Sequence, residues 1–590
     1  MAAHTESFLS RTRHLLLPLL LLGSTGWGLA QTPQRELTPN PELLAEFRRY
    51  YQWTQGVSPD GRWAHKIALS EGDNVEYGAY AWNLADGHVR ATLRTPEPVG
   101  RFVWRPDSRA ISYFSQSSSN LRRLFVWNLD DDRQREILIP TSYAQAIIKW
   151  SPDSRRLAFT SDQGGMVIAD TESGRVVTAL GELTVLSFDW ADDSVHLAAI
   201  TDEGENAISI LSAETGDLME KIQVAVDTTE LKEIAWQGSR SFLVLAEKRA
   251  RRSKQAAETT LYSLDRDKGV ATELQQSSLK LINGIRWLAE QQYVWHEREP
   301  DGTQAILIGK IGSTMAKRFL LDGTLNFRAF LPETQTIVAA YNSLKENALF
   351  TFPFDQSSPP VLVAGSQCPS CPDSTHEKID LRDAAGQKIP IILSRAARDK
   401  KYADAAIIRL HGGIPATNGW EQTQLSVNHG VHALHLVIRE PTATADLLQA
   451  CDYAHAVLGV PRDRIVILGA STASRFVLEA CIVGPEKFGI AVVIGVGNPP
   501  QVVGPSHGGK VPRLFAFHGE NDRTIAPARA KSIIEAALGT EILRSQRGIW
   551  HVFPGEDHSL RRIESHATIY SLLLSELGAY PRPEMVGAVR

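Results

Sequence analysis

The stretch WSPDSRRLAF at residues 150–159 is one copy of a repeat that decides the fold of most of this chain. A close copy, WRPDSRAISY, begins at Trp104, and a weaker one, WADDSVHLAAI, begins at Trp190. Seven copies, spaced about 40 to 50 residues apart, begin at Val57, Trp104, Trp150, Trp190, Ala235, Arg286 and Ala329. A period of this length is typical of propellers and other repeat architectures.

Each copy has an apolar strand end, a polar turn and then an alternating strand. The turns carry Pro-Asp or Asp-Ser/Gly, which are residues that favour a tight corner. Further short strands such as residues 123–129 fill the space between copies. Four strands per period predict a propeller blade, and a closed ring of blades protects strand edges. The sequence therefore favours an all-β, seven-bladed β-propeller over residues 51–365; the alternative is an open sandwich or solenoid with the same hairpins.

The pattern changes near residue 365, where the repeat ends. Short apolar strands at residues 405–410, 465–468 and 490–496 now alternate with segments of helical character, such as residues 445–458. Alternation of this kind predicts a mostly parallel sheet covered by helices on both faces. We expect an α/β-hydrolase domain over residues 366–590.

The N-terminus resembles an export signal. Basic residues precede an apolar run at residues 15–23, and small residues end at Ala30. The run of about ten residues is too short to span a bilayer, which needs roughly 20. We expect a cleaved signal peptide over residues 1–30, and export to the periplasm or outside the cell without a stable membrane anchor. The alternative is an uncleaved anchor.

Length and charge bound the remaining possibilities. A chain of 590 residues is too long for one core, so it contains more than one domain. A formal net charge of −5 and the lack of a basic stripe argue against a nucleic-acid partner.

Four cysteines occur, and an exported chain leaves them free to oxidise. Cys368 and Cys371 form CPSC in a polar stretch with no second Cys/His pair nearby, which favours a small disulfide over a metal or redox site. Cys451 and Cys481 lie on the helices expected before and after the strand at residues 465–468, so they are candidates for a second bridge.

The sequence IVILGASTASRF at residues 465–476 predicts a strand, a sharp turn and a helix with Ser471 at the turn. A nucleophile elbow needs small residues on both sides of its serine, because strand and helix backbones approach closely there. Gly469 and Ala473 occupy those positions. The alternative is an ordinary helix-capping serine.

Two further residues suit a catalytic triad. Asp522 follows an apolar strand in LFAFHGENDRTIAP, and His558 follows another strand in FPGEDHSLRR. Alone, the aspartate would be a turn cap and the histidine a solvated loop residue, whereas His551, inside its strand, is expected to pack. Each of Ser471, Asp522 and His558 nevertheless follows an expected strand, and their order along the chain is the serine, aspartate, histidine order of α/β-hydrolases. We therefore predict that Ser471 is the nucleophile, Asp522 the acid that orients the histidine, and His558 the general base.

An oxyanion hole completes the predicted site. HGG follows the strand at residues 405–410, and Gly412 and Gly413 are candidate backbone donors. The N–H of Thr472, directly after the nucleophile, is the other candidate. Such chemistry requires neither a metal nor an organic cofactor.

The repeats resemble those of TolB-like propellers and of the prolyl oligopeptidase family of serine peptidases. HGG, GASTA, HGENDRTIAP and GEDH extend the resemblance to that family over essentially the whole mature chain. The resemblance implies hydrolysis of short peptides, with a propeller covering the active site. It also implies an N-terminal arm, over residues 31–50, that leads into the first blade. The family usually has an aromatic residue and two glycines after the nucleophile, where this chain has Thr472, Ala473 and Ser474.

Three functions therefore compete. The leading hypothesis is an exported serine peptidase that cleaves short peptides through Ser471. A carboxylesterase-like hydrolase is the alternative within enzymes, favoured by the compact region between Ser471 and Asp522. A catalytically dead scaffold that binds a partner through its propeller is the third, favoured by the missing glycines.

Overall fold

A computed structural model describes residues 37–579 apart from gaps at 38, 51–52, 70–76, 117–121, 139–146, 161–164, 181–183, 203–205, 227–228, 249–257, 278–280, 290, 300–302, 314, 345, 368–374, 397–403, 412–419, 503–511, 546, 559 and 561. The expected signal peptide, residues 1–30, and the CPSC stretch lie outside these residues. Within the described part of the chain, no helix is long and apolar enough to cross a membrane.

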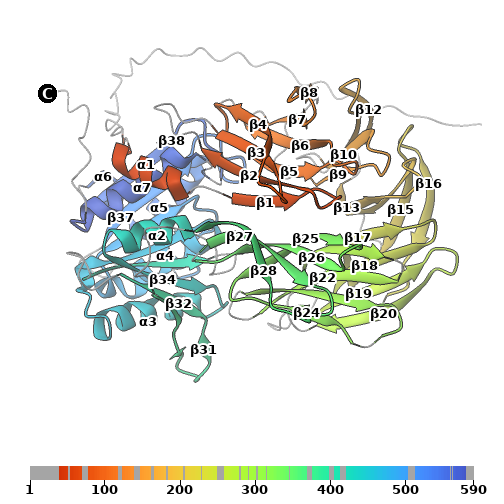
Figure 1. Cartoon of the computed structure of the whole chain (residues 1–590). Coiled ribbons are helices and arrows are strands. Elements are labelled where there is room, and N and C mark those ends of the chain that lie inside the picture. Colours follow the sequence, from red (N-terminus) through yellow and green to blue (C-terminus); the bar gives the residue numbers. More distant parts are fainter. Residues whose placement is uncertain are drawn as a thin grey trace, which may run out of the picture. The chain divides into compact units, whose positions relative to one another are not determined.

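The repeat region folds into antiparallel sheets, and five of them have four strands each in chain order (Figure 1). The first two are β1 (Trp53–Val57), β2 (Trp63–Leu69), β3 (Tyr77–Asn83) and β4 (Val89–Thr95), then β5 (Val99–Trp104), β6 (Ala110–Gln116), β7 (Arg122–Asn128) and β8 (Gln134–Ile137). The third and fourth are β9 (Ile148–Trp150), β10 (Arg156–Thr160), β11 (Met166–Asp170) and β12 (Arg175–Leu180), then β13 (Val185–Trp190), β14 (His196–Thr201), β15 (Ala207–Ser212) and β16 (Leu218–Gln223). The fifth is β17 (Thr229–Gln237), β18 (Ser241–Lys248), β19 (Glu258–Asp265) and β20 (Val270–Ser277).

The last two repeats share one sheet of eight strands. It contains β21 (Leu281–Ala289), β22 (Gln292–Arg298), β23 (Gln304–Lys310), β24 (Lys317–Phe319), β25 (Thr324–Leu331), β26 (Thr336–Asn342), β27 (Glu346–Pro353) and β28 (Val361–Gln367). Only one parallel residue pair, Gln304 with Thr324, joins β23 to β25, and all other pairings in this sheet are antiparallel. Two four-stranded antiparallel units therefore remain recognisable within it.

The residues that define the repeat connect one sheet to the next. Three tryptophans at or near the end of a first strand donate their indole N–H to the first strand of the preceding sheet: Trp150 to Val103 O at 3.2 Å, Trp190 to Lys149 O at 3.1 Å and Trp287 to Ala235 O at 3.3 Å. The Pro-Asp turns also connect neighbouring sheets. The N–H of Asp153, in the turn between β9 and β10, donates to Ser194 Oγ, in the turn between β13 and β14, at 2.9 Å. The repeat is thus a set of contacts between sheets as well as a turn signal.

The first and last sheets also pack together. Val57 and Ala64 share one buried apolar cluster with Ala329, Val338 and other residues of β25–β27. Burial of apolar surface is the main force that stabilises such packing.

The C-terminal region forms a second sheet of eight strands in the order β29-β32-β34-β33-β35-β36-β37-β38. Its strands are β29 (Thr375–Lys378), β32 (Ile391–Arg395), β33 (Ala405–His411), β34 (Val431–Val437), β35 (Ile465–Ala470), β36 (Ile490–Ile494), β37 (Arg513–Gly519) and β38 (Gly548–Phe553). All pairings from β34 to β38 are parallel. The carboxyl ends of these strands therefore meet at one edge.

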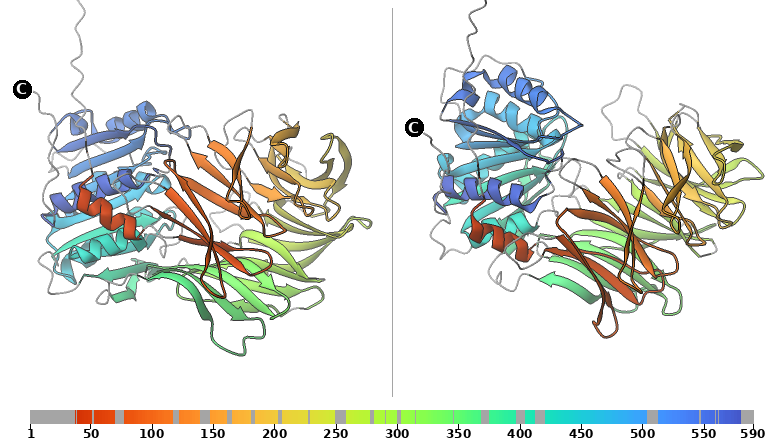
Figure 2. Two further views of the ribbon diagram at one scale, coloured as in Figure 1. Left: turned by 45° about the horizontal axis from the view of Figure 1, so that its top comes forward. Right: turned by 90° about the horizontal axis from the view of Figure 1, so that it is seen from above.

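Helices cover both faces of this sheet (Figure 2, right). One face packs on α1 (Pro41–Tyr50), α2 (Trp420–Asn428) and α7 (Ile563–Glu576), and the other on α3 (Ala443–Ala456), α4 (Thr472–Val483) and α5 (Pro527–Leu538). Alternate strand residues explain this, because Val466 and Leu468 point to the first group while Ile465 and Ile467 point to the second. The minor elements are β30 (Leu381–Arg382), β31 (Lys388–Ile389), the 3-10 turns η1 (Arg462–Arg464) and η2 (Pro485–Lys487), and α6 (Glu541–Arg544).

Candidate active site

Ser471 stands between β35 and α4, at the carboxyl edge of the parallel sheet. Its backbone has φ 53° and ψ −123°, a conformation that L-residues rarely adopt. Its N–H donates to Ile494 O at 2.8 Å, which connects the turn to the end of β36. Non-glycine residues held in such conformations are concentrated at functional sites, and nucleophile elbows are one example.

The turn is tight enough to require a residue without a side chain at position 469. A Cβ on Gly469 would lie 2.6 Å from Ala473 O and 2.8 Å from Val477 Cγ2. Ala473 itself is fully buried and accommodated. Ser474 then holds the turn from within, because its Oγ donates to Gly469 O or Ile494 O, each at 3.0 Å.

Ser471 does not act as a side-chain helix cap. Its side chain makes no capping hydrogen bond to α4. Instead, its Oγ lies 2.8 Å from His558 Nε2, although the two residues are 87 positions apart in the chain. This hydrogen bond is the contact that a general base makes with a serine nucleophile.

The chain of hydrogen bonds continues from His558 to Asp522. The Nδ1–H of His558 donates to Asp522 Oδ2 at 2.6 Å, which leaves the lone pair of Nε2 facing the serine hydroxyl. The structure therefore brings together the three residues that the sequence singled out, in a serine–histidine–aspartate order. The side chain of His558 is 22% exposed, whereas that of Asp522 is fully buried.

Electrostatics favour an ionised aspartate beside the histidine. Burial alone would raise the pKa of Asp522, but hydrogen bonds from His518, His558 and the N–H of Ile525 hold that pKa well below its usual range. The hydrogen bond with Asp522 raises the pKa of His558 against the opposing effect of burial. A carboxylate that stabilises the imidazolium is what a proton-accepting histidine needs.

His518 is a member of this group that the sequence reasoning missed. It lies in β37, its side chain is fully buried, and its Nε2 is 3.0 Å from Asp522 Oδ2 and 2.8 Å from Ile525 O. Both neighbours are acceptors, so the proton is on Nε2. A signal was available, because His518 is a polar residue near the end of the apolar strand RLFAFHG.

Of the expected oxyanion donors, the structure describes Thr472 but not Gly412 or Gly413. Thr472 is the first residue of α4, so its N–H has no acceptor one turn earlier in that helix. Gly412 and Gly413 lie outside the described residues, although His411 at the end of β33 is described. His551 lies inside β38 with its ring edge-on to Phe553, at 4.5 Å between ring centres, in agreement with the packing role expected for it.

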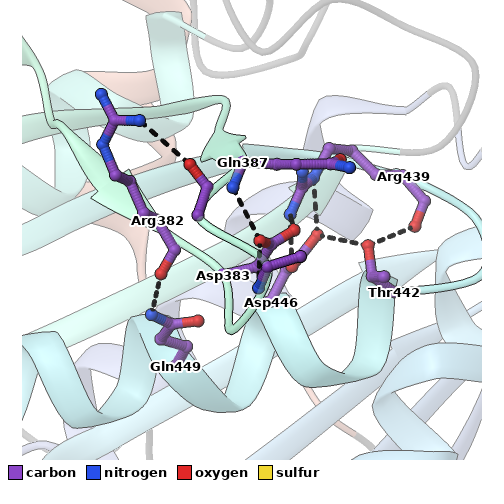
Figure 3. A network of polar contacts seen from close by, with 9 residues as sticks. Arg382, Asp383, Gln387, Arg439, Thr442, Asp446 and Gln449 are labelled. Atoms are coloured by element: carbon purple, nitrogen blue, oxygen red, sulfur yellow. Dashed lines mark hydrogen bonds and ion pairs between the residues drawn. The ribbon is translucent and has the colours of Figure 1, made fainter.

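The loop after β34 reaches the same edge of the sheet and is held by a charged network (Figure 3). Arg439 donates to both oxygens of Asp446, at 2.9 and 2.7 Å, and to Asp383 Oδ2 at 3.1 Å. Thr442 adds a hydroxyl hydrogen bond to Asp446. Glu440, which follows Arg439 in the loop, forms an ion pair with Arg475 at 3.0 Å. Arg475 belongs to α4 and lies one helical turn after Ser471.

The structure corrects one expectation about the cysteines. Cys451 of α3 and Cys481 of α4 are free and buried, so the bridge considered between them does not form. Both thiols belong to the apolar packing of these helices against the sheet, and burial raises the pKa of Cys481 to about 12. A buried thiol of this kind behaves as a small apolar side chain. Cys368 and Cys371 lie outside the described residues.

Among the residues that are described, no group of three or more His, Cys, Asp or Glu could hold a metal ion.

Comparison with known proteins supports the fold. No protein-family model matches the sequence. Over 120 residues, or 20% of this chain, the sequence is 35% identical to the Tol-Pal system protein TolB of Alcanivorax borkumensis, and the match spans 27% of that protein's length. A solved structure of a prolyl endopeptidase matches with a TM-score of 0.68 and 14% identity over 92% of both chains. At that identity, the likeness shows that the chain shares the β-rich, multi-sheet fold of that endopeptidase.

Proposed function

We propose that this chain is an exported serine hydrolase that cleaves short peptides through an acyl-enzyme on Ser471. The observation that carries the proposal is the hydrogen-bonded sequence Ser471 Oγ, His558, Asp522 at a strained turn. A serine that merely capped a helix would have no reason to meet a histidine whose other nitrogen is fixed by a buried carboxylate.

The geometry supports a two-step acyl transfer. His558 takes the proton of the Ser471 hydroxyl as the oxygen attacks the substrate carbonyl, and then gives it to the leaving amine. Water repeats the sequence on the acyl-enzyme. The N–H of Thr472 and the positive end of α4 would stabilise the oxyanion, and backbone N–H groups of Gly412 and Gly413 are proposed as its other donors. No step of this scheme calls for a metal or organic cofactor.

We assign the chemistry to an α/β-hydrolase domain over residues 366–590, preceded by a seven-bladed propeller over residues 51–365. The parallel sheet with helices on both faces supports the first, and the seven repeats with their inter-sheet tryptophan contacts support the second. Preference for peptides rests on the fold shared with a prolyl endopeptidase. Export rests on the character of residues 1–30.

Labelling with a fluorophosphonate probe tests the nucleophile. We expect the purified chain to be labelled, and Ser471→Ala and His558→Ala to abolish labelling while preserving the melting temperature. Ser532→Ala is the matched control, because Ser532 is an exposed serine of α5 whose hydroxyl bonds only within its own helix. A folded chain that takes no label would overturn the proposal in favour of a binding scaffold. For a labelled chain, a panel of short peptides and simple esters distinguishes a peptidase from a carboxylesterase.

A further inference from the structure

One buried carboxylate beside the catalytic group has no part in the acyl transfer described above. Glu556 stands two residues before His558, in the loop between β38 and α7, and is only 2% exposed. Burial of a carboxylate is costly unless hydrogen-bond donors satisfy it. The donors that Glu556 accepts from therefore indicate what this residue holds in place.

The side chain of Glu556 connects its loop to the start of α7. Its Oε1 accepts from the N–H of Arg562 at 2.9 Å and from the hydroxyl of Ser565 at 2.5 Å. Arg562 directly precedes the helix and makes no side-chain capping hydrogen bond, while Ser565 lies in the first turn. The carboxylate thus supplies an acceptor at a helix end, where the helix dipole also favours a negative charge.

The main chain of Glu556 connects the same loop to the one that carries Asp522. Its carbonyl oxygen accepts from the N–H of Asn521 at 2.9 Å. The two loops approach so closely that a Cβ on Gly519 would lie 2.6 Å from Glu556 O and also overlap Asp557 O. The loop of the base and the loop of its orienting carboxylate therefore pack as one unit.

The position of this loop decides whether the triad is assembled. His558 makes both of its catalytic contacts from it, at 2.6 Å to Asp522 Oδ2 and 2.8 Å to Ser471 Oγ. A displacement of about 1 Å in a catalytic group can cost about two orders of magnitude in rate. A residue that fixes the loop on two sides can therefore control the reaction without contacting the substrate.

We propose that Glu556 is a positioning residue for the catalytic base: its buried carboxylate holds the loop of His558 against α7, so that His558 meets both Asp522 and Ser471. This inference rests on the proposed function, because it adds a residue to that reaction. A carboxylate that only capped α7 would contribute to stability but would leave the pKa and the reactivity of the triad unchanged.

Two substitutions of Glu556 test this role. Glu556→Ala removes the acceptor, whereas Glu556→Gln keeps it, because both side-chain hydrogen bonds end on Oε1 and one amide oxygen can accept both. In Glu556→Ala we expect fluorophosphonate labelling to be slower by about tenfold or more. We also expect the pKa of His558, followed by NMR titration, to fall toward 6.5, since its hydrogen bond with Asp522 weakens. Glu556→Gln should stay near the wild type in both measurements.

Glu297→Ala is the control for lost stability alone. Glu297 is likewise a buried carboxylate, 5% exposed, and accepts from Arg318 at 3.0 Å, but it lies in β22 of the repeat region. It should lower the melting temperature and leave the labelling rate and the pKa of His558 as they are in the wild type.

A pair of serines in α7 serves if Glu556→Ala does not fold. Ser565→Ala removes one of the two donors to Glu556 and should slow labelling by about threefold. Ser571→Ala is its matched control, because Ser571 is equally buried in the same helix but accepts from the N–H of Asn40 at 3.0 Å. Equal labelling rates in the two serine variants would contradict the proposal.

Three results with the glutamate variants would overturn the proposal. The first is a folded Glu556→Ala that keeps the labelling rate or the pKa of His558 of the wild type. The second is an equal loss in Glu556→Gln, which retains the acceptor oxygen, and the third is an equal loss in Glu297→Ala. A wild type that takes no label would refute the proposed function instead. The NMR titration would then still decide whether Glu556 positions His558, because it needs no turnover.

Discussion

His518 Nε2 lies 3.0 Å from Asp522 Oδ2, the same oxygen that accepts the 2.6 Å hydrogen bond from His558 Nδ1. One carboxylate oxygen thus serves two histidines, while Oδ1 accepts from the N–H of Ile525 at 2.9 Å. Each donor limits the rotation of the carboxylate and shares its charge. His518 is therefore a positioning residue for the proposed reaction, acting on His558 through Asp522.

Replacing His518 should change the pH dependence of catalysis as well as its rate. In His518→Phe the ring can still stack on Trp550, with which His518 now packs at 5.9 Å between ring centres, but the N–H is lost. Asp522 then becomes a stronger acceptor for His558 alone. We expect kcat/KM to fall about tenfold and its acid limb to move to higher pH.

A pH-rate profile with a peptide or ester substrate measures both effects. His551→Phe is the comparison, because the His551 ring, in the neighbouring strand β38, packs edge-on against Phe517 and Phe553. If His518→Phe lowered the rate without moving the acid limb, His518 would have only a packing role. An NMR titration of His558 gives the same comparison without turnover.

The pKa of His558 sets a second expectation. Its hydrogen bond with Asp522 raises this pKa above the ordinary value of 6.5, and the base must be neutral to act. Activity should therefore rise with pH through a midpoint above 6.5. Asp522→Asn should move that midpoint down and lower kcat by about 10⁴, the loss seen when an orienting aspartate is neutralised.

The same shifts predict how stability depends on pH. A raised histidine pKa contributes stability that is complete below the unfolded value of 6.5 and is lost as pH rises through the folded value. A lowered aspartate pKa contributes stability above the unfolded value of 3.8 and loses it as pH falls through the folded value. The free energy of unfolding, measured in urea at several pH values, should lose both of these pH dependences in Asp522→Asn. If the variant kept the pH dependence of the wild type, the hydrogen bond between Asp522 and His558 would not be its cause.

The sequence predicts much of this site because its signals are local. Gly469, Ser471 and Ala473 stand at fixed offsets on one turn, and the apolar strands before Asp522 and His558 place both residues at one edge of a parallel sheet. The chain order then selects the triad. His518 was missed because its role depends on the direction of a side chain at the end of β37, which spacing along the chain does not specify.

The repeats predict the sheets for a similar reason, since each copy carries its own turn and strand pair. The single parallel pair between Gln304 and Thr324, which joins two repeats into one sheet, has no local signal. The same holds for the cysteines: Cys451 and Cys481 lie on neighbouring helices as expected, but whether two thiols meet depends on helix rotation, which the sequence leaves open.

Gly469 provides a test of the elbow itself. Gly469→Ala introduces a methyl group 2.6 Å from Ala473 O, so the turn must open. We expect a loss of about 1–3 kcal/mol in the free energy of unfolding and loss of fluorophosphonate labelling. Ala473→Gly adds no atom to the turn and should keep the label, with about 1 kcal/mol lost to helix propensity. Equal labelling of both variants would show that the turn tolerates this change.

The loop network at Arg439 should be an energetic anchor of the catalytic edge. The Asp446 side chain is 1% exposed and receives two hydrogen bonds from Arg439, so Asp446→Ala leaves a largely buried guanidinium poorly paired. We expect a loss of about 3–5 kcal/mol in the free energy of unfolding, measured in urea. Asp383→Ala should lose less, because Asp446 still holds Arg439 by two bonds. Adding Arg439→Met to Asp446→Ala should recover part of the loss by removing the unpaired charge; a fully additive double variant would show that the pair is not coupled.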